Sequence, residues 1–347
     1  MKYFNLHDIL SRNAILNMII GHRSAGKTYS FKEWSIKDWK KNGKEFMYIR
    51  RYKNEIDNVK DTLFDDIADK YNIEVRCIGK KYEARNIPTD EDIENLSDKE
   101  LRKKYPWKTF GWAIALSQQQ MYKSASWPNV NKMCLDEFII ENPRQHYLEN
   151  EVNQLLSLYF TIDRNRGDVR IILLSNSGFL SNPYFTEYDI KAKDIMKSHW
   201  IKRKNGFVVC NYYENEENSK ELTNSNLGKI STDKYKDYAI NNEFADANNN
   251  FVIEKKPKGY SYVITITDGE TKLDLYRSTG NNDDVFNTIW VTIGKGNNML
   301  STNPSMPIEN APYQREYISF LRNLTHKLLV TYQSPEARIA WYDMVKP

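Results

Sequence analysis

An eight-residue loop near the amino terminus constrains this chain more than any other feature. It has the form G-x-x-x-x-G-K-[ST], follows the apolar run of residues 15–20, and precedes an amphipathic helical pattern over residues 29–40. Strand, glycine loop and helix is the context in which this motif binds nucleotide phosphates. The predicted phosphate-binding residues are Gly21, His22, Arg23, Ser24, Ala25, Gly26, Lys27 and Thr28.

Each part of the loop has a chemical task. The two glycines let the backbone curl so that its N–H groups point at phosphate oxygens, and the helix that starts near Lys27 adds the positive end of its dipole. The Lys27 ammonium reaches the β- and γ-phosphates, and the Thr28 hydroxyl holds Mg²⁺. We therefore expect ATP and Mg²⁺ as cofactors, rather than a plain glycine turn between a strand and a helix.

Composition limits the class of protein. The chain has 347 residues, room for two or three domains, and a net charge of +4, which permits a nucleic-acid partner. Its three cysteines and five histidines are scattered, so we expect neither disulfides nor a structural metal. No stretch approaches the roughly 20 apolar residues of a membrane span, and the first residues lack a signal peptide's apolar core. We expect an intracellular protein that is not secreted and has no membrane partner.

Predicted strands and helices alternate after the loop. This alternation favours an α/β fold with a mainly parallel sheet and helices on both faces, in which ligands bind at the carboxyl ends of the strands. The glycine loop, Asp136-Glu137 and Ser175-Asn176 all fall at such ends. We also predict a helical pattern over 53–70, a hairpin over 74–84 and a charged surface insertion over 88–104. The predicted strands cover residues 15–20, 45–50, 112–116, 133–135 and 169–174.

Side chains at these strand ends suggest ATP hydrolysis. Asp136 can support Mg²⁺ opposite Thr28, and the adjacent Glu137 can polarise the attacking water. Asn176 can contact the γ-phosphate, although Ser-Asn also ends many strands without any such role. Arg164 and Arg166 raise the question of a cation that stabilises the transition state, which the residues themselves leave open.

The composition changes beyond residue 213. We predict a P-loop domain over residues 1–213, a helical linker region over 214–247 and a small domain over 248–347. The small domain should contain strands at 251–254, 260–267, 273–277 and 288–293 and helices at 314–329 and 335–344. Two-metal nucleases need several converging carboxylates. Here Asp274 is the one acid well inside a predicted strand, whereas Asp268, Glu270, Asp283 and Asp284 fall in turns. Lys255, Lys256 and Lys258 could instead meet nucleic-acid phosphates.

A series of motifs then makes a family resemblance specific. In chain order they are residues 21–28 (GHRSAGKT), 46–53 (FMYIRRYK), 111–117 (GWAIALS), 128–130 (PNV), 135–138 (LDEF), 164–166 (RNR), 174–176 (LSN) and 182–185 (NPYF). Together they resemble the genome-packaging ATPases of small Picovirinae-type bacteriophages, which are related to large-terminase ATPases. The likeness covers the first domain and continues weakly at 242–244 and 251–255.

The resemblance implies a mechanism and partners. The fold would be a P-loop NTPase of the additional-strand catalytic glutamate class plus a small RNase H-like domain that has lost its nuclease activity. The protein would be an ATP-driven motor that moves double-stranded viral DNA into a prohead. It would work as a homo-oligomeric ring, a pentamer, docked through the portal and a packaging RNA, in the host cytoplasm. The family pattern places a trans-acting arginine on Arg164 and a weaker second contact on Lys123.

Two other functions are compatible with parts of the pattern. A P-loop kinase of a small molecule would need neither Glu137 nor a DNA partner, and the chain shows no obvious lid for an acceptor. A nucleotide-gated assembly or adaptor protein would bind ATP with little turnover. ATPase activity measured with and without DNA and proheads separates the three.

Overall fold

The computed structural model divides the chain into two compact units, Met1–Ser177 with His199–Asn242 and Gly178–Ser198 with Glu243–Pro347. It describes residues 3–140, 146–177, 182–191, 194–195, 198–213, 216–231, 251–278, 288–303, 311–326 and 329–345. Most of the predicted linker region and the acids Asp283 and Asp284 lie outside these residues. The division into three predicted segments stays a prediction.

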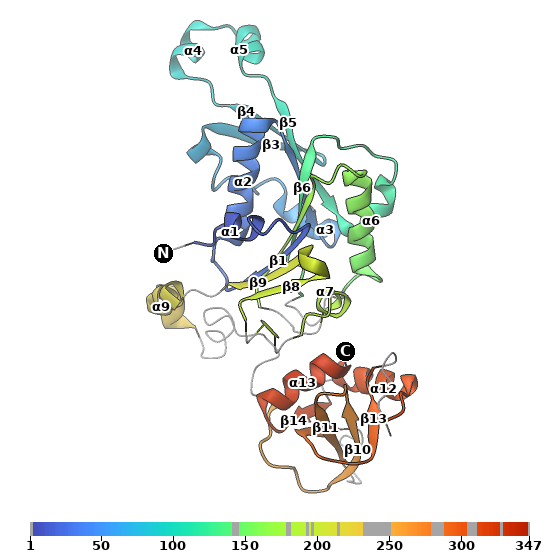
Figure 1. Ribbon diagram of the computed structural model, residues 1–347. Coiled ribbons are helices and arrows are strands. Elements are labelled where there is room, and N and C mark those ends of the chain that lie inside the picture. The colour runs from blue at the N-terminus through green and yellow to red at the C-terminus, as the bar shows by residue number, and fades with distance from the viewer. Residues whose placement is uncertain are drawn as a thin grey trace. The chain divides into compact units, whose positions relative to one another are not determined.

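In the described part of the first unit, nine strands form one sheet (Figure 1). The order is β3 (Ile73–Ile78), β4 (Lys81–Asn86), β5 (Lys108–Ala115), β2 (Glu45–Arg50), β6 (Val130–Asp136), β7 (Arg170–Ser175), β1 (Leu16–Gly21), β9 (Val208–Tyr213) and β8 (Trp200–Arg203). The six strands listed from β5 through to β9 pair in parallel, whereas the pairings β3–β4, β4–β5 and β8–β9 at the two edges are antiparallel.

The strand order places the predicted site residues side by side. β7 lies between β1, which leads into the glycine loop, and β6, which ends at Asp136. In the register, Ile20 is opposite Ser175 and Asp136 is opposite Leu174. All six residues of β1 are buried, as expected for a central strand covered on both faces. The mainly parallel α/β sheet predicted from the sequence is therefore confirmed.

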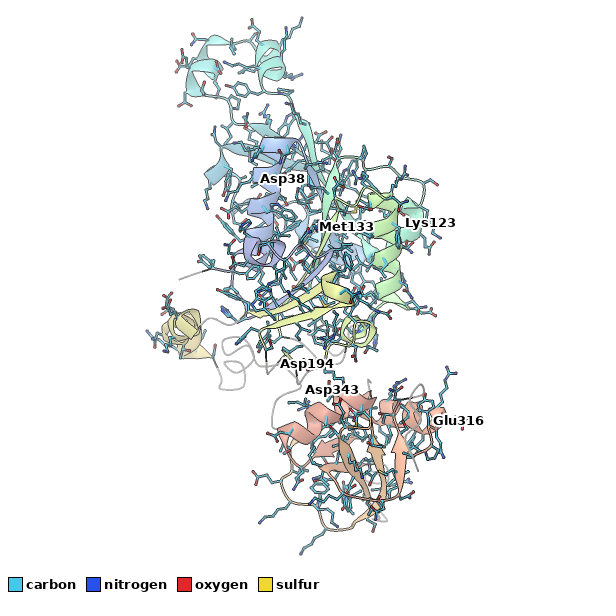
Figure 2. The ribbon with its side chains drawn as sticks, in the orientation of Figure 1. Asp38, Lys123, Met133, Asp194, Glu316 and Asp343 are labelled. Atoms are coloured by element: carbon cyan, nitrogen blue, oxygen red, sulfur yellow. The ribbon has the colours of Figure 1, made fainter. Side chains whose placement is uncertain are left out.

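Helices cover both faces of this sheet. α2 (Lys27–Asn42) lies on one face and α6 (Glu151–Asp163) on the other (Figure 1). Met133 of β6, labelled in Figure 2, is fully buried between the layers. The other helices and 3₁₀ turns are α1 (Leu6–Leu10), α3 (Lys53–Val59), α4 (Asp90–Asn95), α5 (Asp98–Lys104), α9 (Glu216–Asn224), α10 (Asn226–Ile230), η1 (Asp69–Tyr71), η2 (Leu116–Tyr122) and η3 (Lys204–Gly206).

Two predicted elements were wrong. The helix expected over 53–70 ends at Val59, and turns with i→i−3 hydrogen bonds follow it. The apolar spacing beyond Val59 still has a purpose, because the Phe64 ring packs 5.3 Å from Phe46 and 4.9 Å from Phe110 in the core. The strand expected over 251–254 is absent from this described segment, where Val252 forms only an isolated bridge to Tyr332.

The charged insertion over 88–104 projects beyond β4 and β5 as two short helices, α4 and α5 (Figure 1). Thr89 caps α4 through its side chain, and Ser97 with Glu100 forms a capping box at the start of α5. None of the residues of either helix is fully buried, so the insertion is a surface element. The hairpin predicted before it is confirmed as β3 and β4.

The described part of the second unit holds a smaller sheet in the order β13 (Met299–Ser301), β10 (Tyr260–Thr267), β11 (Lys272–Ser278), β12 (Ile289–Ile293) and β14 (Val330–Tyr332). β10, β11 and β12 form an antiparallel meander, and β13 and β14 add parallel strands at its two edges. Leu275, Leu321 and Trp341 are among the residues of its core. Its helices are α7 (Pro183–Glu187), α12 (Arg315–His326) and α13 (Pro335–Val345).

Among the described residues, no helix has the length and apolar character needed to cross a membrane.

Candidate active site

The glycine loop joins β1 to α2 through two residues with positive φ. Ser24 has φ 60° and Gly26 has φ 83°, and residues other than glycine rarely adopt this left-handed conformation. A Cβ atom on Gly21 would lie 3.0 Å from the Tyr213 carbonyl oxygen, so this position also favours glycine. On the outer side of the loop, the Ala25 carbonyl accepts a hydrogen bond from the Phe4 N–H at 2.8 Å.

Lys27 is the buried cation of the loop. Its Nζ atom donates hydrogen bonds to the Gly21 carbonyl at 2.7 Å, the His22 carbonyl at 2.9 Å and Asn176 Oδ1 at 3.0 Å. The third bond joins two motifs that are 149 residues apart in the sequence. All three acceptors are neutral oxygens, which phosphate oxygens can replace.

His22 is buried beside Lys27. Its Nδ1 atom lies 2.7 Å from the Arg23 carbonyl, so Nδ1 carries the proton in this contact. Burial lowers the pKa of the imidazole, and the Lys27 charge acts in the same direction. The neutral ring therefore adds no positive charge to the phosphate loop.

Asp136 lies at the carboxyl end of β6, opposite the loop. Its Oδ2 atom accepts a hydrogen bond from Thr28 Oγ1 at 3.2 Å and another from the Tyr48 hydroxyl at 2.8 Å. Burial, and then the Asp136 charge, raise the pKa of Tyr48, so its hydroxyl keeps its proton and donates. The hydroxyl and carboxylate oxygens suit Mg²⁺, which prefers oxygen ligands. Sequence reasoning missed Tyr48, because only the pairing of β2 with β6 brings it to Asp136.

Glu137 follows Asp136 in a left-handed conformation with φ 58°. Its carboxylate forms an ion pair with Arg50 at 2.6 Å, while its backbone carbonyl accepts a hydrogen bond from Arg51 at 3.2 Å. More than half of its side chain is exposed, so the carboxylate has room to turn away from Arg50. Arg50 and the adjacent Arg51 thus both pair with acids, Arg50 with Glu137 and Arg51 with Glu151.

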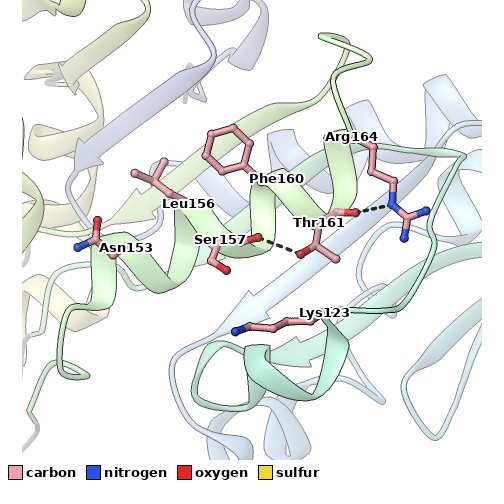
Figure 3. Close-up of a pocket in the computed structure, with 7 residues that line it drawn as sticks. All are labelled: Lys123, Asn153, Leu156, Ser157, Phe160, Thr161 and Arg164. Carbon is pink, nitrogen blue, oxygen red and sulfur yellow. Dashed lines mark hydrogen bonds between the residues drawn. The ribbon is translucent and has the colours of Figure 1, made fainter.

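Arg164 lies near the amino-terminal end of the parallel strands, opposite the end that carries the glycine loop. It follows the end of α6 and precedes β7, whose six residues span about 20 Å. Arg164 therefore does not reach the glycine loop of its own chain. Together with Lys123 it lines an open pocket of about 690 Å³ on the surface of α6 (Figure 3).

The two arginines of the 164–166 motif differ in their contacts. The Arg164 guanidinium donates to the Ala125 carbonyl at 2.7 Å and to the Thr161 carbonyl at 3.3 Å, and the residue is exposed. Arg166 donates to four backbone carbonyls, which fasten the end of α6 to the start of β6. They are those of Pro128, Val130, Ile162 and Asp163.

Comparison with known proteins decides the family. The model of the family described as podovirus DNA encapsidation protein (Gp16) matches residues 1–88 and 90–296. This chain belongs to that family. The DNA packaging protein of Bacillus phage phi29 is 33% identical over 266 residues, which are 76% of this chain and 72% of the relative. That of Bacillus phage B103 is 33% identical over 262 residues, 74% of this chain and 73% of the relative.

Solved structures agree with this family. The N-terminal domain of the DNA packaging ATPase from bacteriophage phi29 aligns with a TM-score of 0.51 and 32% identity, over 61% of this chain and 96% of that domain. A chain of the bacteriophage Phi-29 viral genome packaging motor assembly aligns over 100% of both chains, with a TM-score of 0.58 and 23% identity. Family membership and the phi29 relatives make this protein a DNA packaging ATPase of the phi29-like phages.

In the described residues of the second unit of this Gp16-family chain, no group of three or more His, Cys, Asp or Glu side chains converges. Asp274 of β11 instead accepts hydrogen bonds from the Thr265 hydroxyl at 2.5 Å, the Gly296 N–H at 3.2 Å and the Lys295 N–H at 3.3 Å. These bonds hold the 294–296 turn against the sheet, which is a structural use of the carboxylate.

Proposed function

We propose that this ATPase hydrolyses Mg²⁺-ATP at the carboxyl edge of its large sheet and uses the energy to move double-stranded viral DNA into a prohead. The observation that carries the proposal is the convergence of three motifs on one edge. Lys27 donates a hydrogen bond to Asn176, and the Thr28 and Tyr48 hydroxyls both donate to the same carboxylate oxygen of Asp136. The family match favours neither a small-molecule kinase nor an adaptor protein without turnover.

In this proposal each residue has one task. Residues 21–28 hold the phosphates, with Lys27 as the main charge, while Thr28 and Asp136 hold Mg²⁺. When bound, the metal neutralises charge on the phosphates as the bond to the γ-phosphate breaks. Glu137 orients and polarises the attacking water after its carboxylate leaves Arg50, and Asn176 responds to the γ-phosphate. The β7 strand between β1 and β6 supports the additional-strand catalytic glutamate class.

Arg164 acts on the neighbouring subunit in this proposal. It is exposed, lies an entire strand length from its own glycine loop and shares its pocket with Lys123. A cation on that surface can complete the site of an adjacent copy, and an arginine supplied in this way accelerates related hydrolases by about 10³- to 10⁵-fold. The four carbonyl contacts of Arg166 make Arg164 the better candidate of the two.

We further propose that the subunits form a pentameric ring, docked on the portal of the prohead through a packaging RNA in the host cytoplasm. The family of the chain and its likeness to a packaging motor support this assembly. We also propose that the second unit is RNase H-like and binds nucleic acid without cutting it. Its antiparallel meander with parallel edge strands and the structural contacts of Asp274 support that proposal.

Mixed rings test the shared site. Arg164→Ala subunits and Lys27→Ala subunits should each hydrolyse ATP poorly alone, the first for lack of the arginine and the second for lack of phosphate binding. Their mixture should recover activity, because some interfaces pair an intact loop with an intact arginine. A matched control mixes Arg164→Ala subunits with the Lys27→Ala/Arg164→Ala double variant, which offers no arginine. The trans role of Arg164 is wrong if co-assembled mixtures show no more activity than this control.

A further inference from the structure

A buried ion pair lies directly behind the proposed general base. Arg51, which directly follows β2, donates from Nε to Glu151 Oε2 at 2.7 Å and from Nη2 to Glu151 Oε1 at 3.0 Å. Both side chains are almost completely buried, with 3% and 0% of their surfaces exposed. The two residues are 100 positions apart in the sequence, and Glu151 is the first residue of α6.

The same guanidinium also holds the backbone that carries Glu137. Arg51 Nη1 donates to the Glu137 carbonyl at 3.2 Å, and Nη2 donates to the Phe138 carbonyl at 2.7 Å. From the other side, the Phe138 N–H donates to the Leu174 carbonyl of β7 at 3.1 Å. Glu137 therefore keeps its left-handed backbone because β2 and β7 fix the segment from two directions.

Glu151 in turn holds Arg51 in this position. Its two carboxylate oxygens accept the two guanidinium bonds, and Oε2 also accepts the Leu148 N–H at 2.9 Å. The ring of Tyr147 lies 4.9 Å from the guanidinium carbon. A planar guanidinium held by a bidentate carboxylate has a fixed direction, so its remaining donors point at a fixed place. Here the remaining donors point at the backbone carbonyls of Glu137 and Phe138.

We propose that Arg51 and Glu151 are positioning residues for ATP hydrolysis. They fix the backbone of Glu137 so that its carboxylate can exchange Arg50 for the attacking water by side-chain rotation alone. The inference rests on the proposed role of Glu137 and adds two residues that act through its backbone. Because Glu151 begins α6 and Arg164 follows its end, the pair also anchors the helix that presents Arg164 to the next subunit.

The test compares Glu151→Gln with wild type in the full-length protein. Glutamine preserves the shape and leaves one acceptor oxygen, but it loses the second acceptor and the charge that orient Arg51. We expect kcat for ATP to fall about 10- to 100-fold, the cost of a small misplacement of a catalytic group. The Kd for a fluorescent, non-hydrolysable ATP analogue should stay within about twofold of wild type, since the glycine loop is untouched.

A second buried ion pair, on the strand β6 that leads to Glu137, supplies the control. Lys132, at the start of β6, pairs with Asp38 of α2 at 2.6 Å, and its side chain is 0% exposed (Asp38 is labelled in Figure 2). Lys132→Met breaks a buried pair at the opposite end of β6 from Glu137. Thermal melting should show destabilisation by this variant, while its kcat at a temperature where it is folded should match wild type.

A double-mutant cycle separates positioning from general destabilisation. If the pair acts through Glu137, adding Glu151→Gln to Glu137→Gln should lower the residual rate no further. The proposal is overturned if folded Glu151→Gln keeps wild-type kcat, or if its effect adds fully to that of Glu137→Gln. Should Glu151→Gln not fold, Arg51→Lys, which keeps the charge but loses the bidentate contact, gives the same comparison. Wild-type rates for Glu137→Gln alone would instead refute the proposed general base.

Discussion

Replacing Tyr48 by phenylalanine removes one oxygen atom from the proposed metal site. The Tyr48 hydroxyl is buried and donates to Asp136 Oδ2 at 2.8 Å, the oxygen that also accepts from Thr28. A hydrogen bond to a charged group contributes about 1.5–3 kcal/mol. Asp136 keeps its bonds from Thr28 and the Glu137 N–H, so we expect the lower end of that range, which corresponds to about a tenfold change in Mg²⁺ dependence.

The measurement is the ATPase rate as a function of Mg²⁺ concentration at saturating ATP. Without the hydroxyl, Asp136 is less firmly held beside Thr28, and the Mg²⁺ concentration for half-maximal rate should rise about tenfold. Binding of a fluorescent ATP analogue should weaken in Mg²⁺ but stay unchanged in EDTA. The second readout is independent of turnover, so it isolates the effect on metal binding.

Tyr82→Phe is the matched control. Tyr82 is also buried, and its hydroxyl donates at 2.8 Å to a neutral acceptor, the Lys60 carbonyl, away from the site. Tyr82→Phe should lose about 1 kcal/mol of folding stability, and Tyr48→Phe about 1.5 kcal/mol. Equal Mg²⁺ dependence in the two variants would refute the reasoning, because it would show that the Tyr48 bond to Asp136 does no more than an ordinary buried hydrogen bond.

Two further predictions concern the separate tasks of the two units. Lys27→Ala should abolish tight ATP binding, whereas Glu137→Gln should bind ATP normally and lose hydrolysis, since its shape remains but the water is no longer polarised. Equilibrium binding measures the first effect and phosphate release the second. Normal hydrolysis by Glu137→Gln would contradict its assignment as the general base. Full-length protein incubated with labelled DNA or RNA in Mn²⁺ should show salt-sensitive binding without cleavage, because Asp274 is engaged in the 294–296 turn. Metal-dependent cleavage that disappears in Asp274→Asn would contradict this.

Local patterns determined much of this protein. The glycine loop, the strand over 45–50, the hairpin before the insertion and the capping box at Ser97 follow from neighbouring residues, because turn chemistry and apolar periodicity act over a few positions. The same patterns failed over residues 60–68, where apolar spacing serves core packing in a segment of turns. Periodicity reports which side chains are buried, and it does not by itself specify the backbone that buries them.

The composition of the site was only partly readable from the sequence. Lys27, Thr28, Asp136, Glu137 and Asn176 stand out because each falls in a motif at a strand end. The partners of Tyr48, Arg51 and Glu151 are not evident from the sequence, since each contacts a residue 86 to 100 positions away. Tertiary structure decided these contacts through the order of the strands, which places β2 beside β6 and β7 between β6 and β1. Strand order depends on how helices and long connections pack over the whole sheet, and no short window of sequence contains that information.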